Sequence, residues 1–356
     1  MKKMMAVILT VLLSAAVVSC SSKEVEGVMQ NVSSADVVST ITDTPDGTAI
    51  TLKESDTQIS GAGAQADGAD VTISSAGTYN ISGETTDGTV TVDAPGGEVV
   101  LILNGVSIKS ASGPAILIKD AGSVTVTLAD GTVNTLEDAG ESNYDGALYG
   151  CISYTINGEG TLVVNGTAEE GIASEMHLTI ESGTIEITAS DDGINANNDG
   201  VSEIIINGGT IYINAGGDGI DSNGSIEMNG GTVVTFGAVN DANGGLDADS
   251  GITMNGGTVL ATGANISTPS GGAQKYIVAS VNGQAGDTVS IGANGAELFS
   301  AELAQTCRMI LYSSPDIEEG AVYDVSLNGT VQASVTTDDV NAAGGPGGGK
   351  QPMPMN

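Results

Sequence analysis

Short runs of alternating apolar and polar residues recur along most of the chain, and tight turns separate them. In the middle of the sequence the runs flank an Asn-Gly-Gly turn, as in EIIIN-GG-TIYIN, SIEMN-GG-TVVTF and GITMN-GG-TVLAT. Alternation enriched in Ile, Val and Thr is typical of β-strands, and Asn-Gly and Gly-Gly pairs are typical of turns. No run has the 3.6-residue period of a capped helix, so the pattern predicts an all-β fold.

The paired runs return at a nearly constant interval. Gly-Thr pairs begin at residues 160, 183, 209, 231 and 257, with spacings of 23, 26, 22 and 26. Self-similarity at this period indicates a repeat architecture. Leucine-rich repeats have a similar length, but their Leu ladder is absent from the sequence. We therefore predict a right-handed parallel β-helix, in which strands of successive turns pair about 4.8 Å apart.

The same alignment predicts which side chains face the interior of the β-helix. One inward column comprises Ile156, Ile180, Ile206, Met228 and Met254, and its neighbour comprises Tyr154, Leu178, Ile204, Ile226 and Ile252. Each turn buries its row of side chains only by stacking on the next turn, so at least three turns are needed for stability.

The chain divides into five predicted segments. They are a lipoprotein signal peptide (1–19), a flexible tether (20–40), the parallel β-helix domain (41–271), a small C-terminal β module (272–337) and a disordered Gly/Pro-rich tail (338–356). The first segment has a basic start, an apolar stretch and small residues before Cys20, as export signals do. Its Val-Val-Ser-Cys end resembles a bacterial lipobox, which predicts lipidation of Cys20. The alternative is a free cysteine near an ordinary cleavage site.

Two cysteines remain, Cys151 and Cys307, far apart in the sequence. A disulfide between them is compatible with an oxidising compartment. Each cysteine also lies in a strand-like run, where a cysteine behaves as a small apolar side chain. Both interpretations stay open, and a cysteine-based metal site has no support.

The charge balance narrows the choice of partner. The 356 residues include 44 acids against 9 bases, for a formal net charge of -35, while 40% of residues are hydrophobic. The apolar content is enough to build a core, which disordered acidic chains lack. Direct binding to nucleic acid is excluded, because it requires basic side chains to neutralise phosphates. Cations are the natural partners of such a surface.

The acids and amides of the repeats fall into register. Asn195, Asp221 and Asp247 recur every 26 residues, and so do Asn197, Asn223 and Asp249. A third set, Glu170, Asp192 and Asp218, precedes the corner glycines and ends where Gly244 replaces the acid. Residues two apart on a strand face the same way, so these sets predict outward columns of oxygen ligands. The candidate metal ligands are Glu170, Asp191, Asp192, Asn195, Asp218, Asp221, Asp241, Asp247 and Asp249.

Stacked carboxylates repel one another, and the sequence has no Lys or Arg between Lys119 and Lys275. Calcium binds oxygens at about 2.3–2.6 Å, so an ion between oxygens of neighbouring turns fits a strand spacing near 4.8 Å. Oxygen ligands without His or Cys favour Ca²⁺, and the strict octahedron of Mg²⁺ disfavours that ion. The alternative is that these acids only keep the surface soluble.

These phrases resemble secreted β-helix carbohydrate-binding proteins that bind calcium and pectin-type acidic glycans and are related in fold to family 9 pectate lyases. The resemblance is carried by Asp-Gly-Ala-Leu (145–148), Asn-Gly-Glu-Gly-Thr-Leu (157–162), Glu-Gly-Ile-Ala-Ser (170–174), Asp-Asp-Gly-Ile (191–194), Gly-Asp-Gly-Ile-Asp (217–221) and Gly-Gly-Leu-Asp (244–247). It implies calcium ligands at Asp191, Asp192, Asp218, Asp221 and Asp247. Ala173 and Gly244 depart from the pattern, so the row of ions should thin out at both ends.

Three functions are compatible with this sequence. We expect an exported bacterial lipoprotein, anchored through Cys20 in the cell envelope or at the cell surface, that binds acidic polysaccharide such as pectin or polygalacturonate without catalysis. A structural or adhesion protein stiffened by calcium is the first alternative. A polysaccharide lyase is the second, but it needs a Lys or Arg base near the calcium. No such residue occurs between residues 120 and 274.

Overall fold

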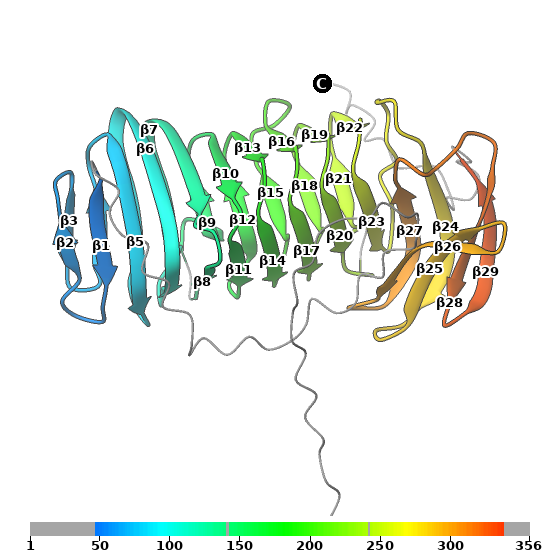
Figure 1. Cartoon of the computed structure of the whole chain (residues 1–356), viewed down its shortest axis with the longest axis horizontal. Coiled ribbons are helices and arrows are strands. Elements are labelled where there is room, and N and C mark those ends of the chain that lie inside the picture. The colour runs from blue at the N-terminus through cyan, green and yellow to red at the C-terminus, as the bar shows by residue number, and fades with distance from the viewer. Residues whose placement is uncertain (1–46, 140–141, 241–242, 338–356) are drawn as a thin grey trace, which may run out of the picture.

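The computed structural model describes residues 47–139, 142–240 and 243–337. Its elements are all β-strands (Figure 1), and the described residues include no helix that is long and apolar enough to cross a membrane. The predicted signal peptide, the tether with Cys20, the Gly/Pro-rich tail and Asp241 lie outside the described residues.

The central part of the chain is a parallel β-solenoid with three strands in each turn. The first column of strands comprises β9 (Gly146–Gly150), β12 (Glu170–Ser174), β15 (Ile194–Ala196), β18 (Ile220–Ser222) and β21 (Leu246–Ala248). The second comprises β10 (Tyr154–Gly158), β13 (His177–Ile180), β16 (Glu203–Ile206), β19 (Ser225–Met228) and β22 (Gly251–Met254). The third comprises β11 (Thr161–Gly166), β14 (Thr184–Ala189), β17 (Thr210–Ala215), β20 (Thr232–Phe236) and β23 (Thr258–Gly263).

Each strand pairs in parallel with its counterpart in the next turn, which confirms the predicted β-helix. The second column aligns Leu178 with Ile204 and then with Ile226, as the sequence alignment predicts. Both predicted inward columns are buried, and they belong to one continuous hydrophobic core. The turns between the second and third columns end at glycines with positive φ, for example Gly209 at 89°, a conformation that favours glycine.

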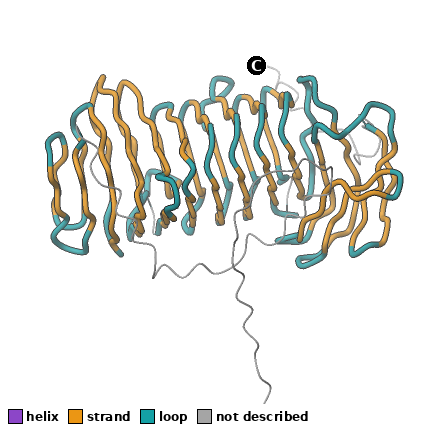
Figure 2. Tube along the Cα trace, viewed as in Figure 1, coloured by secondary structure: helices purple, strands orange, loops and turns teal. Residues whose placement is uncertain are grey.

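Upstream, the same coil continues with less regular strands, three of which are much longer than those of the later turns. These are β1 (Thr48–Leu52), β2 (Gln58–Ser60), β3 (Ala64–Asp67), β4 (Asp70–Ile73), β5 (Gly77–Thr85), β6 (Val90–Lys109), β7 (Ile116–Leu128) and β8 (Val133–Glu137). Strand β6 pairs in parallel with both β7 and β8, so a single strand passes around the corners that separate the later columns. Figure 2 shows this change from long strands to short ones along the solenoid.

One buried polar side chain lies at an inward position of this region. Asn134 in β8 is fully buried and aligns with Leu162 of the next turn. Its side-chain oxygen accepts the amides of Gly105 and Val106 at 2.9 and 3.1 Å, where the pairing of β6 with β5 shifts register. Its side-chain nitrogen donates to the hydroxyl of Thr132 and to the carbonyl of Thr161. The amide therefore satisfies backbone groups that an irregular strand leaves unpaired.

Antiparallel strands close the C-terminal end of the solenoid. Strand β27 (Cys307–Ser313) pairs with β23 of the last turn and with β24 (Tyr276–Gly283). A separate antiparallel sheet has the order β26 (Ala296–Glu302), β25 (Thr288–Ala293), β28 (Val322–Leu327) and β29 (Thr330–Thr336). This module packs against outward side chains of the third column, among them Val234, Phe236 and Leu260, in a second hydrophobic core. Cys151 and Cys307 are both free thiols here, so the disulfide interpretation is not supported.

Candidate functional site

The outward side chains of the first column change character along the solenoid. Turn by turn, the register aligns Leu117, Tyr149, Ala173, Asn195, Asp221 and Asp247. The first three form a small apolar cluster, and the last three are polar or acidic. We call Asn195, Asp221 and Asp247, with the corner residues Asp192 and Asp218, the acidic row.

The corner acids are tied to the backbone of the following turn. Oδ1 of Asp192 accepts the amide of Asp218 at 2.7 Å, and Oδ1 of Asp218 accepts the amide of Gly244 at 2.5 Å. Each acid therefore bonds to the residue that takes its own place one turn later, as the sequence alignment predicts. Because one oxygen of each carboxylate is fixed in this way, the direction of the other oxygen is also restricted.

A glycine makes room for the carboxylates at this corner. A Cβ atom on Gly217 would lie 2.2 Å from Oδ1 of Asp191 and 2.4 Å from Oδ1 of Asp192, well inside van der Waals contact. The carboxylates of Asp191 and Asp192 therefore occupy the space that a side chain at position 217 would need. Any larger residue at position 217 would push them away.

Three carboxylates of the acidic row converge. Asp218, Asp221 and Asp247 each offer one oxygen, and these oxygens lie within 4.8 Å of one another. A cation bound at about 2.3–2.6 Å from two oxygens spans up to about 5 Å, so this spacing suits calcium. Oδ1 of Asp247 also accepts the hydroxyl of Ser267 at 2.5 Å, which holds the most exposed of the three.

Asn195 and Asp192 extend the row by one turn. The amide nitrogen of Asn195 donates to Oδ2 of Asp192 at 3.0 Å. Its oxygen, Oδ1, has no hydrogen-bond partner although the residue is only 7% exposed. A buried carbonyl oxygen without a partner is uncommon in proteins, and a cation is one way to satisfy it.

Burial and mutual repulsion disfavour charge in the row. Burial raises the pKa of Asp192 to about 6, of Asp218 to about 7 and of Asp221 to about 8. The charges of neighbouring carboxylates contribute to the same rise in pKa. The ion pairs of the described residues lie elsewhere, and they join Lys109 to Glu137, Lys119 to Asp93 and Lys275 to Glu319.

The remaining predicted ligands are distributed around this cluster. Asp191 and Asp249 are exposed at its flanks, and their charges raise the pKa of Asp218 and of Asp221 respectively. Glu170 lies upstream, where its carboxylate approaches Asp145 and Glu169 instead. The structure therefore brings together three of the nine predicted ligands directly and places Asp192 and Asn195 beside them.

Sequence reasoning missed Asp145 and Glu169. Aligning the Asp-Gly and Glu-Gly phrases would place Asp145 over Glu170, but the structure pairs Gly146 with Glu170. The apolar positions carry the correct signal, because Leu148 pairs with Ile172 and the interval to the preceding acid is one residue longer at Asp145.

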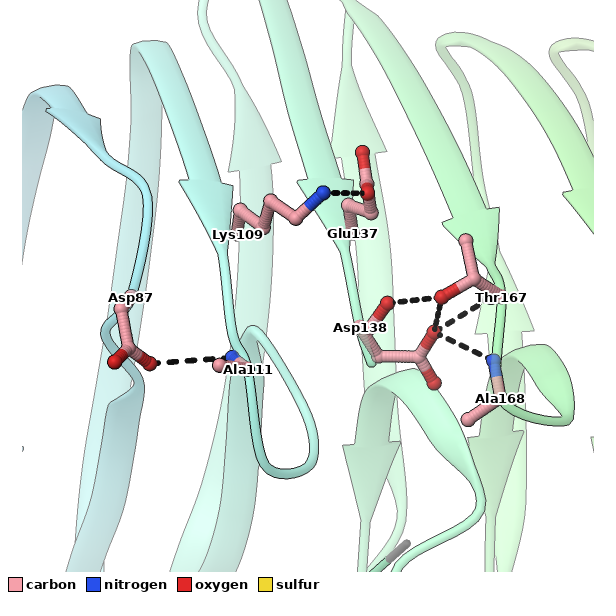
Figure 3. Close-up of polar contacts among 7 residues, drawn as sticks. All are labelled: Asp87, Lys109, Ala111, Glu137, Asp138, Thr167 and Ala168. Atoms are coloured by element: carbon pink, nitrogen blue, oxygen red, sulfur yellow. Dashed lines mark hydrogen bonds and ion pairs between the residues drawn. The ribbon is translucent and has the colours of Figure 1, made fainter. Parts of the chain in front are cut away.

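Other acids in this part of the molecule have structural partners. Figure 3 shows Oδ1 of Asp138 accepting the amides of Thr167 and Ala168, which fixes the corner before β12. In the same view Asp87 accepts the amide of Ala111, and Lys109 pairs with Glu137. These carboxylates cap corners or pair with a base between turns, and none of the three acids belongs to a group of converging carboxylates as Asp218, Asp221 and Asp247 do.

The nearest upstream base on this face is distant from the row. Lys119 follows Leu117 by two residues, and the register puts Leu117 four turns before Asp221. Four strand spacings amount to roughly 19 Å, well beyond the reach of a lysine side chain. Lys119 also pairs with Asp93 at 3.2 Å.

A parallel β-solenoid that carries an acidic row on one face has known relatives. Residues 67–342 match the model of the carbohydrate-binding domain-containing protein family, and the chain belongs to this family. This confirms the carbohydrate-binding part of the resemblance seen in the sequence, and calcium and pectin binding stay predictions.

Two individual proteins show the likeness. A carbohydrate-binding domain-containing protein of Acetivibrio thermocellus is 35% identical over 129 residues, which are 34% of this chain and 45% of that protein. The chain thus matches less than half the length of this relative. A solved structure, described as a polysaccharide lyase-like protein from C. thermocellum in a gadolinium derivative, has a TM-score of 0.50 at 28% identity. The match covers 59% of this chain and 92% of that one.

Proposed function

We propose that this carbohydrate-binding protein holds calcium in its acidic row and uses it to bind acidic polysaccharide, such as pectin or polygalacturonate, without catalysis. The observation that carries the proposal is the convergence of Asp218, Asp221 and Asp247 within 4.8 Å. No basic side chain pairs with these three among the ion pairs of the described residues.

Calcium suits the donors better than other common metals. They are carboxylate and amide oxygens, which hard cations prefer, and neither His nor Cys belongs to the cluster. Gadolinium(III), present in the derivative of the solved relative, is likewise a hard cation that takes oxygen ligands. Asp218, Asp221 and Asp247 would hold the ion, and Asn195 and Asp192 would complete or support its shell.

A bound cation also accounts for an acidic ligand on an acidic protein. With a formal charge of -35, the protein by itself repels a polyuronate. Ca²⁺ takes 6–8 oxygen ligands, more than three carboxylates with other hydrogen-bond partners supply. Its open positions can accept uronate oxygens, so the ion joins two groups of the same sign.

Support for binding without reaction comes from the sequence, which has no Lys or Arg between residues 120 and 274. A lyase uses calcium to acidify the proton next to the uronate carboxylate and a Lys or Arg to remove it. Lys119, the upstream base on this face, lies roughly 19 Å away by the strand spacing. In the proposal the protein is exported and attached to the cell envelope or cell surface by a lipid on Cys20.

Retention on polygalacturonate tests this proposal. The mature protein without Cys20 should be retained with millimolar Ca²⁺ and released by chelator while remaining folded. The double variant Asp218→Asn with Asp221→Asn should lose retention, and Asp130→Asn, an exposed acid in a turn before β8, should keep it. Formation of unsaturated products, seen as ultraviolet absorbance, would instead establish a lyase.

The alternative function is a structural surface protein in which calcium only stiffens the solenoid. It predicts no retention in either buffer and a thermal midpoint that falls when calcium is removed, by mass action. The buried, unpartnered oxygen of Asn195 favours this role, because an ion bound to it would stabilise the fold whether or not a polysaccharide is present.

A further inference from the structure

A cavity of about 550 Å³ opens on the same face as the acidic row, beside the loop that precedes β9. Three acids line it, Asp138, Asp145 and Glu169, together with Tyr144. The ring of Tyr144 lies 5.2 Å from that of Tyr149, which belongs to the apolar cluster of this face. The cavity thus combines an acidic side with an aromatic side.

Three carboxylates converge beside this cavity, and two of them belong to its lining. Asp145, Glu169 and Glu170 each offer an oxygen, and these oxygens lie within 4.8 Å of one another. The strand register holds them there, because Glu170 pairs with Gly146 and its amide donates to the carbonyl of Asp145 at 3.2 Å. Two adjacent turns therefore supply the group, as they do at the acidic row.

Glu170 provides an independent indication of a ligand. The residue is only 7% exposed, and Oε2 has no hydrogen-bond partner. A buried carboxylate oxygen without a partner is costly, and such groups in proteins are normally hydrogen-bonded, paired or bound to a metal. Burial, together with the charge of Asp145, raises the pKa of Glu170 to about 8.

We propose that Asp145, Glu169 and Glu170 form a second binding site for a divalent cation of the calcium class. Asp138 is not a direct ligand through Oδ1, which accepts the amides of Thr167 and Ala168. The carboxylates supply up to six oxygens, and water in the cavity supplies the rest of a shell of 6–8. The bound ion links the loop before β9 to the corner before β12.

This site is separate from the acidic row. The register places its centre between β9 and β12, and that of the row between β18 and β21. The two centres are three strand spacings apart, roughly 14 Å, so each takes its own ion. The proposal for the second site concerns metal binding alone, so it can be tested independently of polysaccharide binding.

Calcium titration by calorimetry on the mature protein tests the proposal. The double variant Asp145→Asn with Glu169→Gln should bind one ion fewer than the wild type, and so should Asp218→Asn with Asp221→Asn. The four-substitution combination should lose both ions, and Asp130→Asn should lose none. An unchanged number of ions in the Asp145/Glu169 variant would overturn the second site, whatever the result for polygalacturonate.

Terbium(III) luminescence gives a second readout, since Tb³⁺ replaces calcium at oxygen sites and is excited by nearby Tyr. The chain has no Trp, and Tyr144 lines the cavity. Tyr144→Phe should reduce the sensitised emission from this site, to which nearby Tyr149 also contributes, and leave the number of ions unchanged. If the double variant does not fold, the single variant Asp145→Asn serves as the test in the calcium titration. At least a tenfold loss of calcium affinity at one of the sites supports the second site, and unchanged affinity overturns it.

Discussion

The amide of Asp218 donates a 2.7 Å hydrogen bond to Oδ1 of Asp192, the residue that occupies the same corner one turn earlier. The bond fixes the position of Asp218, which converges with Asp221 and Asp247. Asp192 thus acts on the cluster both as a charge and as an anchor for the backbone that carries it.

Substituting Asp192 separates these two roles. Asp192→Asn keeps an oxygen that can accept the Asp218 amide and loses the charge, whereas Asp192→Ala loses both. We expect calcium to bind about tenfold more weakly in the Ala variant, near the lower end of the effect of removing an outer-shell partner. The loss of calcium affinity should be smaller in the Asn variant. Calcium titration measures both, and equal losses would contradict the anchoring role.

The stability of the metal-free protein should depend on pH in an unusual direction. The pKa values of Asp192, Asp218 and Asp221 are raised to about 6, 7 and 8, above the value of about 4 in an unfolded chain. The folded protein therefore binds these protons more tightly, and their stabilising effect is complete below about pH 4 and lost as the pH rises through about 8. With chelator, we expect a lower free energy of unfolding at pH 8 than at pH 5.5.

Added calcium should reverse this trend, because deprotonated carboxylates bind the ion. Urea titrations at the two pH values, with chelator and with excess calcium, check both signs. Asp287 acts in the opposite sense, since hydrogen bonds from the Gln284 amide and the Asn328 side chain lower its pKa, but it titrates below this window. Metal-free stability that rises between pH 5.5 and 8 would contradict the prediction.

A methyl group at position 217 should disturb the site from the backbone side. Gly217→Ala places Cβ at 2.2 Å from an oxygen of Asp191 and 2.4 Å from one of Asp192, so both carboxylates must move. We expect at least a tenfold loss in calcium affinity, as for other changes in the support of metal ligands. Gly271→Ala is the matched control, because the nearest atom to its Cβ is a side-chain oxygen of Thr253 at 3.2 Å. Equal affinities in the two variants would show that the corner is not involved.

The buried amide of Asn134 should be essential to the fold and irrelevant to the site. Asn134→Leu leaves the buried amide of Val106 without an acceptor, at about 1–3 kcal/mol, and also removes the bonds of the side chain to exposed Gly105, to Thr132 and to Thr161. We expect a loss of about 2–5 kcal/mol in the free energy of unfolding, measured by urea denaturation. Asn104→Ala, which removes one longer bond to Asn80 at 3.3 Å, should cost much less.

The regular turns were predictable from the sequence because the spacing of the repeats and the apolar alternation within them independently indicate the same stacking of strands. A period near 24 sets the turn, and the apolar alternation sets the register within it, so Ile204, Ile226 and Ile252 fall into one column. The corner acids followed for the same reason. Whether metal binds there is not contained in either pattern.

Two features did not follow from the sequence, and each has a physical cause. Asp145 lies beside Glu169 because the loop before β9 changes the interval between acid and apolar residue, which a phrase alignment cannot detect. The docking of the C-terminal module depends on contacts distant in sequence. In β20 buried and exposed residues no longer alternate, and Val233 and Val234 are both buried, whereas β17 one turn earlier still alternates. This difference is the sign of the docked module within a single strand.

The antiparallel strands at both ends have a consequence for how such a protein can change in length. Strand β2 covers β1 at one end and β27 covers β23 at the other, so these two edges of the solenoid are already paired within the chain. Duplication inside the coil adds a turn without disturbing either of these pairings. An internal duplication of one 26-residue repeat such as 192–217 would lengthen the acidic row by one step and leave both caps unchanged.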